Sequence, residues 1–170
     1  MALYKTKAIV LGSRMFDETA KLVTFFSPEH GKIRIIAKGA KRTNSKFMGR
    51  LETLSVLELL VASGRNLDIL SQCEVVETFP NLRKNYDALL KALYFVRVID
   101  GATLDRQKNF NLFKLLAMSL KKLDEGSSLF EAEKYFEVNF LRVEGLFSSQ
   151  SPPDVLIGEH LGIDIRQWKN

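Results

Sequence analysis

The hydrophobic pattern of the chain changes at Pro80. Before this residue, short segments rich in apolar and β-branched residues alternate with turn signals, which is typical of strands. Five strands are predicted, at residues 5–11, 21–26, 32–37, 54–61 and 68–79. An immunoglobulin-like sandwich needs about seven strands, whereas a five-stranded Greek-key barrel of the oligonucleotide-binding (OB) type matches the count. We therefore predict an N-terminal OB-fold barrel.

After Pro80 the apolar residues recur with the spacing of a helix. Asn85 is a candidate cap for a helix that ends near Gly101, and a second apolar stripe covers residues 113–123. The fold class is thus α+β, with the OB-fold barrel followed by a C-terminal helical domain. We place the domains at residues 1–80 and 81–170.

A third helix is predicted from a capping box formed by Ser128 and Glu131. Its inward-facing stripe is expected to run from Leu129 to Phe147. Residues 148–153 have the composition of a loop, and the last seventeen residues have room for one short helix.

Basic charge is concentrated at the N-terminal end. The net charge is +5, but residues 1–50 hold 11 Lys or Arg against 3 Asp or Glu, and the rest of the chain is slightly acidic. This asymmetry indicates that the N-terminal part contacts nucleic acid or another polyanion. No apolar run approaches the length that spans a bilayer, so no membrane partner is expected.

The densest basic segment, residues 38–50, follows the third predicted strand and is called here the basic connector. It holds five Lys or Arg and no acidic residue. Cations neutralise phosphates and release counterions, and an exposed aromatic ring can stack on an unpaired base. The predicted DNA-binding residues are Arg14, Lys32, Arg34, Lys38, Lys41, Arg42, Lys46, Phe47 and Arg50. The alternative is a solvated loop in which Phe47 packs over the end of the barrel.

Catalytic and metal sites have little support in the sequence. His30 and His160 have no third partner at a suitable spacing for a triad or a metal site. Two pairs of adjacent acidic residues, at 17–18 and 124–125, do not share one face, and no P-loop or GxGxxG motif is present. We expect no catalytic residue, no cofactor and no metal, and hence no enzyme activity.

Cys73 is the only cysteine, which excludes a disulfide within this chain and any zinc site made of several cysteines. It lies in an alternating segment of the fifth predicted strand. We therefore predict a small buried apolar residue rather than a nucleophile.

An ordered series of motifs over about residues 6–82 resembles the RecO family of bacterial recombination mediators. The motifs are Ala8–Gly12, Phe16-Asp17-Glu18, Leu22–Lys32, Ala37–Arg42 with Ser45, Phe47, Gly49 and Leu51, and Leu67–Phe79 with Gln72, Glu74 and Val75. The helical part agrees in kind and placement but carries no distinctive motif.

The resemblance implies a cytoplasmic, nucleoid-associated protein of DNA repair and homologous recombination. It would bind single- and double-stranded DNA, anneal complementary strands and bind RecR and the C-terminal tail of the single-strand-binding protein, helping to load RecA. Many members have a four-cysteine zinc site, which this chain cannot form. Members also extend well past residue 200, so terminal helices are expected to be missing or reduced.

The site for the acidic tail of the single-strand-binding protein is harder to place. Lys114, Lys121 and Lys122 on the second predicted helix form a candidate rim, and the alternative is a solvated helix face. Two other functions stay open. One is an OB-fold protein-interaction module that has lost DNA binding, and the other is an RNA-binding barrel of the translation apparatus.

Overall fold

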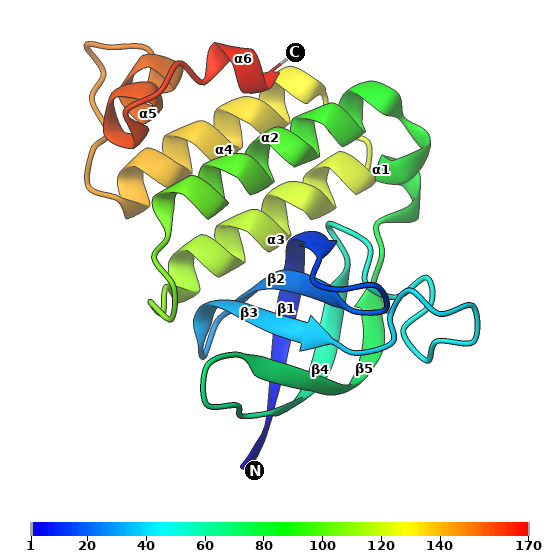
Figure 1. Ribbon diagram of the computed structural model, residues 1–170. Helices are drawn as coiled ribbons and strands as arrows, with labels where there is room; N and C mark the ends of the chain where they lie inside the picture. Colours follow the sequence, from blue (N-terminus) through cyan, green and yellow to red (C-terminus); the bar gives the residue numbers. More distant parts are fainter. Residues whose placement is uncertain (1, 170) are drawn as a thin grey trace. The chain divides into compact units, whose positions relative to one another are not determined.

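The structure is a computed structural model and describes residues 2–169 (Figure 1). The chain forms two compact units. The barrel unit extends to Thr78 and also includes Thr103–Phe110, a later segment of the chain. The helical unit comprises Phe79–Ala102 and the chain from Asn111 onward.

The barrel unit contains five strands, which confirms the predicted OB-type barrel. They are β1 (Leu3–Met15), β2 (Lys21–Ser27), β3 (Gly31–Ala37), β4 (Val56–Ala62) and β5 (Asp68–Glu77). The strand order is β1-β2-β3-β5-β4, and β4 pairs with β1 to close the barrel. The parallel pairing between β3 and β5 is short, since only Ile35–Asp68 and Ile36–Ile69 are in register.

The interior of the barrel follows from the alternation of the strands. Phe25, Ile33 and Ile35 point inward and are fully or almost fully buried. Cys73 is buried in the same core, as predicted, and burial raises the pKa of its thiol. Phe47 of the basic connector also belongs to this core, so the connector closes the barrel with a side chain of its own.

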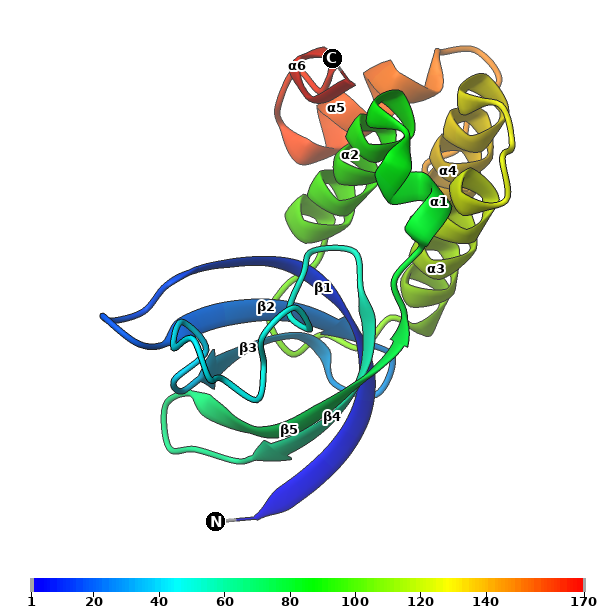
Figure 2. The ribbon, with the colours of Figure 1, turned by 90° about the vertical axis from the view of Figure 1, so that its right-hand side faces the viewer.

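The helical unit contains α1 (Pro80–Lys84), α2 (Tyr86–Ala102), α3 (Phe110–Asp124), α4 (Leu129–Val143), α5 (Pro153–Leu161) and α6 (Arg166–Lys169). The three long helices α2, α3 and α4 run alongside one another (Figures 1 and 2). Their core includes a stacked pair of rings from Phe95 and Phe136, with centroids 4.2 Å apart. No helix among residues 2–169 is long and apolar enough to cross a membrane.

Local capping signals identified the starts of two long helices correctly. The Asn85 side chain accepts a hydrogen bond from the backbone N–H of Ala88 (3.1 Å), directly before α2. The Ser128 hydroxyl accepts one from the N–H of Glu131 (3.1 Å) at the start of α4. Side-chain caps act within one turn of the helix, so the sequence alone reveals them.

Several boundaries differ from the sequence prediction. β1 covers Leu3–Met15 rather than residues 5–11, and β4 begins at Val56 rather than at residue 54. The fifth strand ends at Glu77, because Phe79 adopts a positive φ of 55° before Pro80 opens the unpredicted helix α1. Helix α4 ends at Val143, and the following Gly145 also has a positive φ, of 73°. Phe147 therefore lies outside the helix and is 43% exposed rather than facing inward. The last residues form two short helices, α5 and α6, where one was expected.

Candidate nucleic-acid interface

The outer face of β1, β2 and β3 carries two predicted DNA-binding residues that are exposed, Arg14 and Arg34. Arg14 is paired with Leu22, and Leu22 with Ile36. Two residues further along β2, on the same face as Leu22, Thr24 is paired with Arg34. Directly opposed residues share a face of the sheet. Arg14 and Arg34 thus lie on one face, opposite the side chains that fill the barrel.

The β1–β2 turn is held in one conformation by its own hydrogen bonds. Asp17 Oδ1 accepts from the backbone N–H groups of Thr19 and Ala20, both at 2.7 Å. These bonds hold the pKa of the Asp17 carboxyl below its usual value. The N–H of Phe16 donates to the carbonyl of Ala20 at 3.0 Å. The turn is therefore a defined support for the side chains on it.

The basic connector is bonded to this turn. The backbone N–H of Lys41 donates to the carbonyl of Thr19 at 3.1 Å. Figure 2 shows the turn and the connector at the same end of the barrel. A pocket of about 310 Å³ lies between them, and its lining includes Phe16, Ile36, Lys38 and Arg42. Lys38 and Arg42 are thus exposed beside the β1–β2 turn.

Three cations around this end keep their charge available. Arg14, Lys38 and Arg42 are exposed, and within residues 2–169 their side chains form no ion pair and no hydrogen bond. Lys41 is also exposed and acts electrostatically on Asp17. Unpaired exposed cations produce a positive potential that attracts polyanions.

The other half of the connector is fastened to β5. Lys46 Nζ donates to the carbonyl of Ser71 at 2.6 Å and lies 5.1 Å from the centre of the Phe47 ring. Arg50 Nη1 donates to the carbonyl of Cys73 at 3.1 Å. Both side chains remain exposed, but their donors are engaged by the protein. They hold the connector against the barrel.

The structure corrects two of the predicted DNA-binding residues. Phe47 is only 3% exposed, because the connector folds back and inserts this ring into the barrel core. It packs in the barrel core, as the alternative interpretation expected for this one residue, and is therefore not available to stack on a base. Lys32 is only 7% exposed, and its backbone carbonyl accepts from the N–H of Arg106 at 2.8 Å. The segment 103–110 covers this position.

The same segment supplies a partner for Arg34. Its guanidinium lies 3.2 Å from a carboxylate oxygen of Asp105, and both side chains are about half exposed. A surface ion pair of this kind contributes little to stability and leaves part of the Arg34 charge accessible. Arg34 therefore stays on the candidate surface, with a weaker field than the unpaired cations.

A buried carboxylate that the sequence did not reveal fixes the segment 103–110 to the barrel. Asp68 is 1% exposed and accepts hydrogen bonds from Tyr4 Oη (2.6 Å), the N–H of Gly64 (3.1 Å) and Arg106 Nη2 (2.8 Å). Burial opposes ionisation of Asp68, but these donors outweigh it and hold its pKa below the usual range. Arg106 is 38 residues away in sequence, so no local spacing indicates this cluster.

Residues considered for catalysis or metal binding lie apart. The His30 ring packs 4.5 Å from the ring of Tyr4, and His160 contacts Glu144 at 3.2 Å. Within residues 2–169, no group of three or more His, Cys, Asp and Glu side chains is arranged to hold a metal ion.

The lysines proposed as a rim for an acidic peptide are partly engaged. Lys121 pairs with Glu125 at 3.7 Å, and Lys122 lies 4.6 Å from the centre of the Tyr135 ring. Lys114 is exposed on the same helix, α3.

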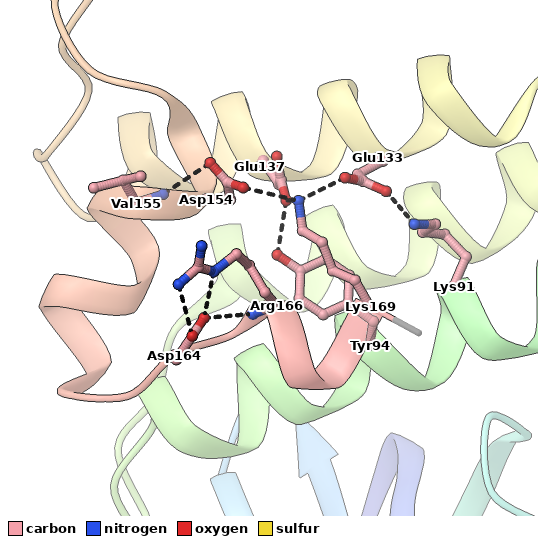
Figure 3. A network of polar contacts seen from close by, with 9 residues as sticks. All are labelled: Lys91, Tyr94, Glu133, Glu137, Asp154, Val155, Asp164, Arg166 and Lys169. Atoms are coloured by element: carbon pink, nitrogen blue, oxygen red, sulfur yellow. Dashed lines mark hydrogen bonds and ion pairs between the residues drawn. The ribbon is translucent and has the colours of Figure 1, made fainter.

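The helical unit contains a separate charged cluster, shown in Figure 3. Lys169 Nζ lies 2.6 Å from Glu133 and 2.7 Å from Glu137, and Lys91 also pairs with Glu133. Tyr94 Oη donates to Glu137 at 2.8 Å. Burial raises the pKa of Glu137, whereas the lysine hydrogen bonds outweigh burial at Glu133 and lower its pKa. The charges of Lys91 and Lys169 are therefore neutralised by carboxylates of the helical unit itself.

Comparison with known proteins gives the chain a family. Residues 1–79 match the profile described as "Recombination protein O N terminal", and residues 83–147 match "Recombination protein O C terminal". The chain is 35% identical to the DNA repair protein RecO of Desulforamulus reducens, over 99% of this chain and 64% of that protein. It is 36% identical to the DNA repair protein RecO of Geobacter metallireducens, over 83% of this chain and 58% of that protein.

A third relative, the DNA repair protein RecO of Pelotomaculum thermopropionicum, is 38% identical over 75% of this chain and 50% of its own length. The chain therefore spans between half and about two thirds of the length of these curated relatives. The two profiles cover most of the chain in the order barrel, then helices. On these matches, the chain belongs to the RecO family.

Proposed function

We propose that this chain acts in DNA repair and homologous recombination by binding the sugar–phosphate backbone of DNA on its barrel unit. The observation that carries the proposal is the group of unpaired, exposed cations at one end of the barrel: Arg14, Lys38 and Arg42. Lys41 and Arg34 extend this surface. Such a surface neutralises phosphates and releases their counterions, which supplies binding energy without reading the base sequence.

Strand annealing follows from the same chemistry. A basic surface that holds two polyanionic strands lowers their mutual repulsion and raises their local concentration. It needs no nucleophile and no metal ion. The proposed activity is therefore binding of single- and double-stranded DNA, followed by annealing of complementary strands.

The proposed partners follow from membership of the family. They are RecR, the C-terminal tail of the single-strand-binding protein and, indirectly, RecA, at a cytoplasmic, nucleoid-associated location. The rim formed by Lys114, Lys121 and Lys122 remains our candidate for the acidic tail. A Lys121→Glu, Lys122→Glu variant that binds the tail peptide normally would remove it.

The DNA-binding proposal is tested by fluorescence anisotropy of a labelled single-stranded oligonucleotide across a salt series. If four to six phosphates are neutralised, log K should fall against log salt with a slope of about −3 to −4. Reversing the charge of Lys41 and Arg42 should weaken binding to all sequences equally, because phosphates carry no base information.

The contrary result is equally clear. Binding that is absent, or that is indifferent to salt and to the charge reversals, would overturn the proposal. The protein would then be better described as an OB-fold module that binds another protein. A preference for structured RNA over DNA would instead favour the RNA-binding alternative.

A further inference from the structure

Phe16 is an exposed aromatic residue beside the unpaired cations. Its side chain is 47% exposed at the end of the β1–β2 hairpin. Single exposed apolar residues are common and need no explanation. Phe16 differs because it lines the pocket of about 310 Å³ together with Lys38 and Arg42. One pocket is thus lined by an aromatic ring and by two basic side chains.

The position of Phe16 is fixed before any ligand arrives. Its backbone N–H donates to the carbonyl of Ala20, and Asp17 caps the turn through two short hydrogen bonds. The bond from Lys41 to Thr19 holds the connector against the turn. A site ordered in advance loses less conformational entropy on binding than a mobile loop.

We propose that this pocket receives one unpaired nucleobase of single-stranded DNA, stacked on the Phe16 ring, while Lys38 and Arg42 contact the flanking phosphates. The inference rests on the proposed function and deepens it. It assigns to the same surface a means of distinguishing single-stranded from double-stranded DNA.

The chemistry of the lining favours a base over other occupants. Phe16 and Ile36 offer apolar surface to a flat ring, and the two cations suit the phosphates on either side of it. Asp17 also lines the pocket, and its negative charge disfavours a free anion inside. Its Oδ1 atom is already engaged by the backbone of the turn. Each base has a π face, so this stacking tolerates any sequence.

Double-stranded DNA should gain nothing from the pocket. A base in a duplex reaches such a pocket only by leaving the stack, which costs a few kcal/mol. The cations contact phosphates of either form. Phe16 is therefore expected to contribute to single-strand affinity alone.

The first test is Phe16→Ala in the full chain. Stacking on one base is worth about 1–3 kcal/mol, so single-strand affinity should fall about 5- to 160-fold. Duplex affinity and the salt slope should not change, because no phosphate contact is removed. Phe16→Trp should retain binding. The matched control is Phe130→Ala, which removes a 76% exposed phenylalanine from α4 and should have no effect.

An abasic oligonucleotide provides a second readout that needs no variant. It presents the same phosphates without bases, so it should bind the unaltered protein as weakly as Phe16→Ala binds normal DNA. Phe16→Ala should not weaken abasic binding further, since the two changes remove the same interaction. Independent, additive losses would overturn the inference.

Phe16→Trp gives a direct signal from the pocket. Single-stranded DNA should quench the fluorescence of the new tryptophan, whereas the unaltered protein, with only Trp168, should show little change. The two proposals fail separately. If the unaltered protein shows no salt-dependent binding, the proposed function is wrong. If it binds with the expected slope but Phe16→Ala binds equally well, only the base pocket is wrong.

If Phe16→Ala proves unstable by thermal melting, the abasic oligonucleotide decides. Equal binding of abasic and normal DNA by the unaltered protein would then reject the pocket.

Discussion

Two groups of basic side chains, one in each unit of this protein, are used in opposite ways. In the helical unit, Lys169 is 17% exposed and lies within 4 Å of three carboxylates, those of Glu133, Glu137 and Asp154 (Figure 3). In the barrel unit, Lys38 and Arg42 are exposed and, within residues 2–169, form no ion pair. A cation neutralised in place supports the fold, whereas an unpaired one attracts a polyanion. Availability of charge, rather than the number of charges, therefore marks the candidate interface.

The largest expected effect is a loss of stability when the paired lysine of the helical unit is replaced. Lys169→Met should lower the free energy of unfolding of the helical unit by about 3 kcal/mol, because it leaves the carboxylates of Glu133 and Glu137 short of a counter-charge in a buried setting. Denaturant unfolding followed by circular dichroism measures the loss. DNA affinity of the folded protein should not change.

Lys121→Met is the matched control for this variant. Lys121 is an exposed lysine that pairs with Glu125 one turn away, so its loss should cost less than about 0.5 kcal/mol. Equal costs for the two variants would mean that the cluster around Lys169 does not stabilise the helical unit.

A smaller effect is expected at alkaline pH. The carboxylates of Glu133 and Glu137 outweigh burial at Lys169 and raise its pKa, while burial and then the charge of Glu137 raise the pKa of Tyr94. A group whose pKa is raised by folding stabilises the protein fully at pH values below its pKa in the unfolded chain, which is about 10 for both groups. This stabilisation is lost as the pH rises through the pKa of the folded protein. For each group, the free energy of unfolding should then fall by up to about 1.4 kcal/mol per pH unit.

Thermal melting between neutral pH and pH values above 10 checks this dependence. Tyr94→Phe should make the alkaline fall shallower, because one of the groups whose pKa folding raises is gone. Tyr86→Phe, which changes a 73% exposed tyrosine, should leave the fall unchanged. A profile that is the same in both variants would exclude Tyr94 as a source of the pH dependence.

The sequence predicted the parts of this fold that depend on local order. The five strands follow from period-two segments bounded by turns, and α2 and α4 begin where Asn85 and Ser128 cap them. The sequence could not decide between the two positions considered for Phe47, because its burial depends on the connector folding back onto β5. Lys32 is likewise covered by a segment more than 70 residues later in the chain.

For the candidate site too, the sequence indicated the residues of a local charge run but not the contacts they make in the folded protein. The charge run identified Lys38, Lys41 and Arg42, and their role in DNA binding stays a prediction. Sequence could not separate them from Lys46 and Arg50, since the hydrogen bonds of the latter two to β5 exist only in the folded barrel. Phe16 was visible as a residue of a turn motif. Its place in a pocket with Lys38 depends on the backbone bond between Lys41 and Thr19.

The most direct measurement compares the two halves of the basic connector at equal charge. Lys38→Gln with Arg42→Gln removes two unpaired cations, and Lys46→Gln with Arg50→Gln removes two that are bonded to β5. Thermal melting confirms that both proteins are folded. Single-strand affinity is then measured across a salt series. If unpaired charge binds the phosphates, the first variant should flatten the slope of log K against log salt by about 1.4, from about 0.7 per phosphate, and the second should change it far less. Equal flattening by both variants would contradict this.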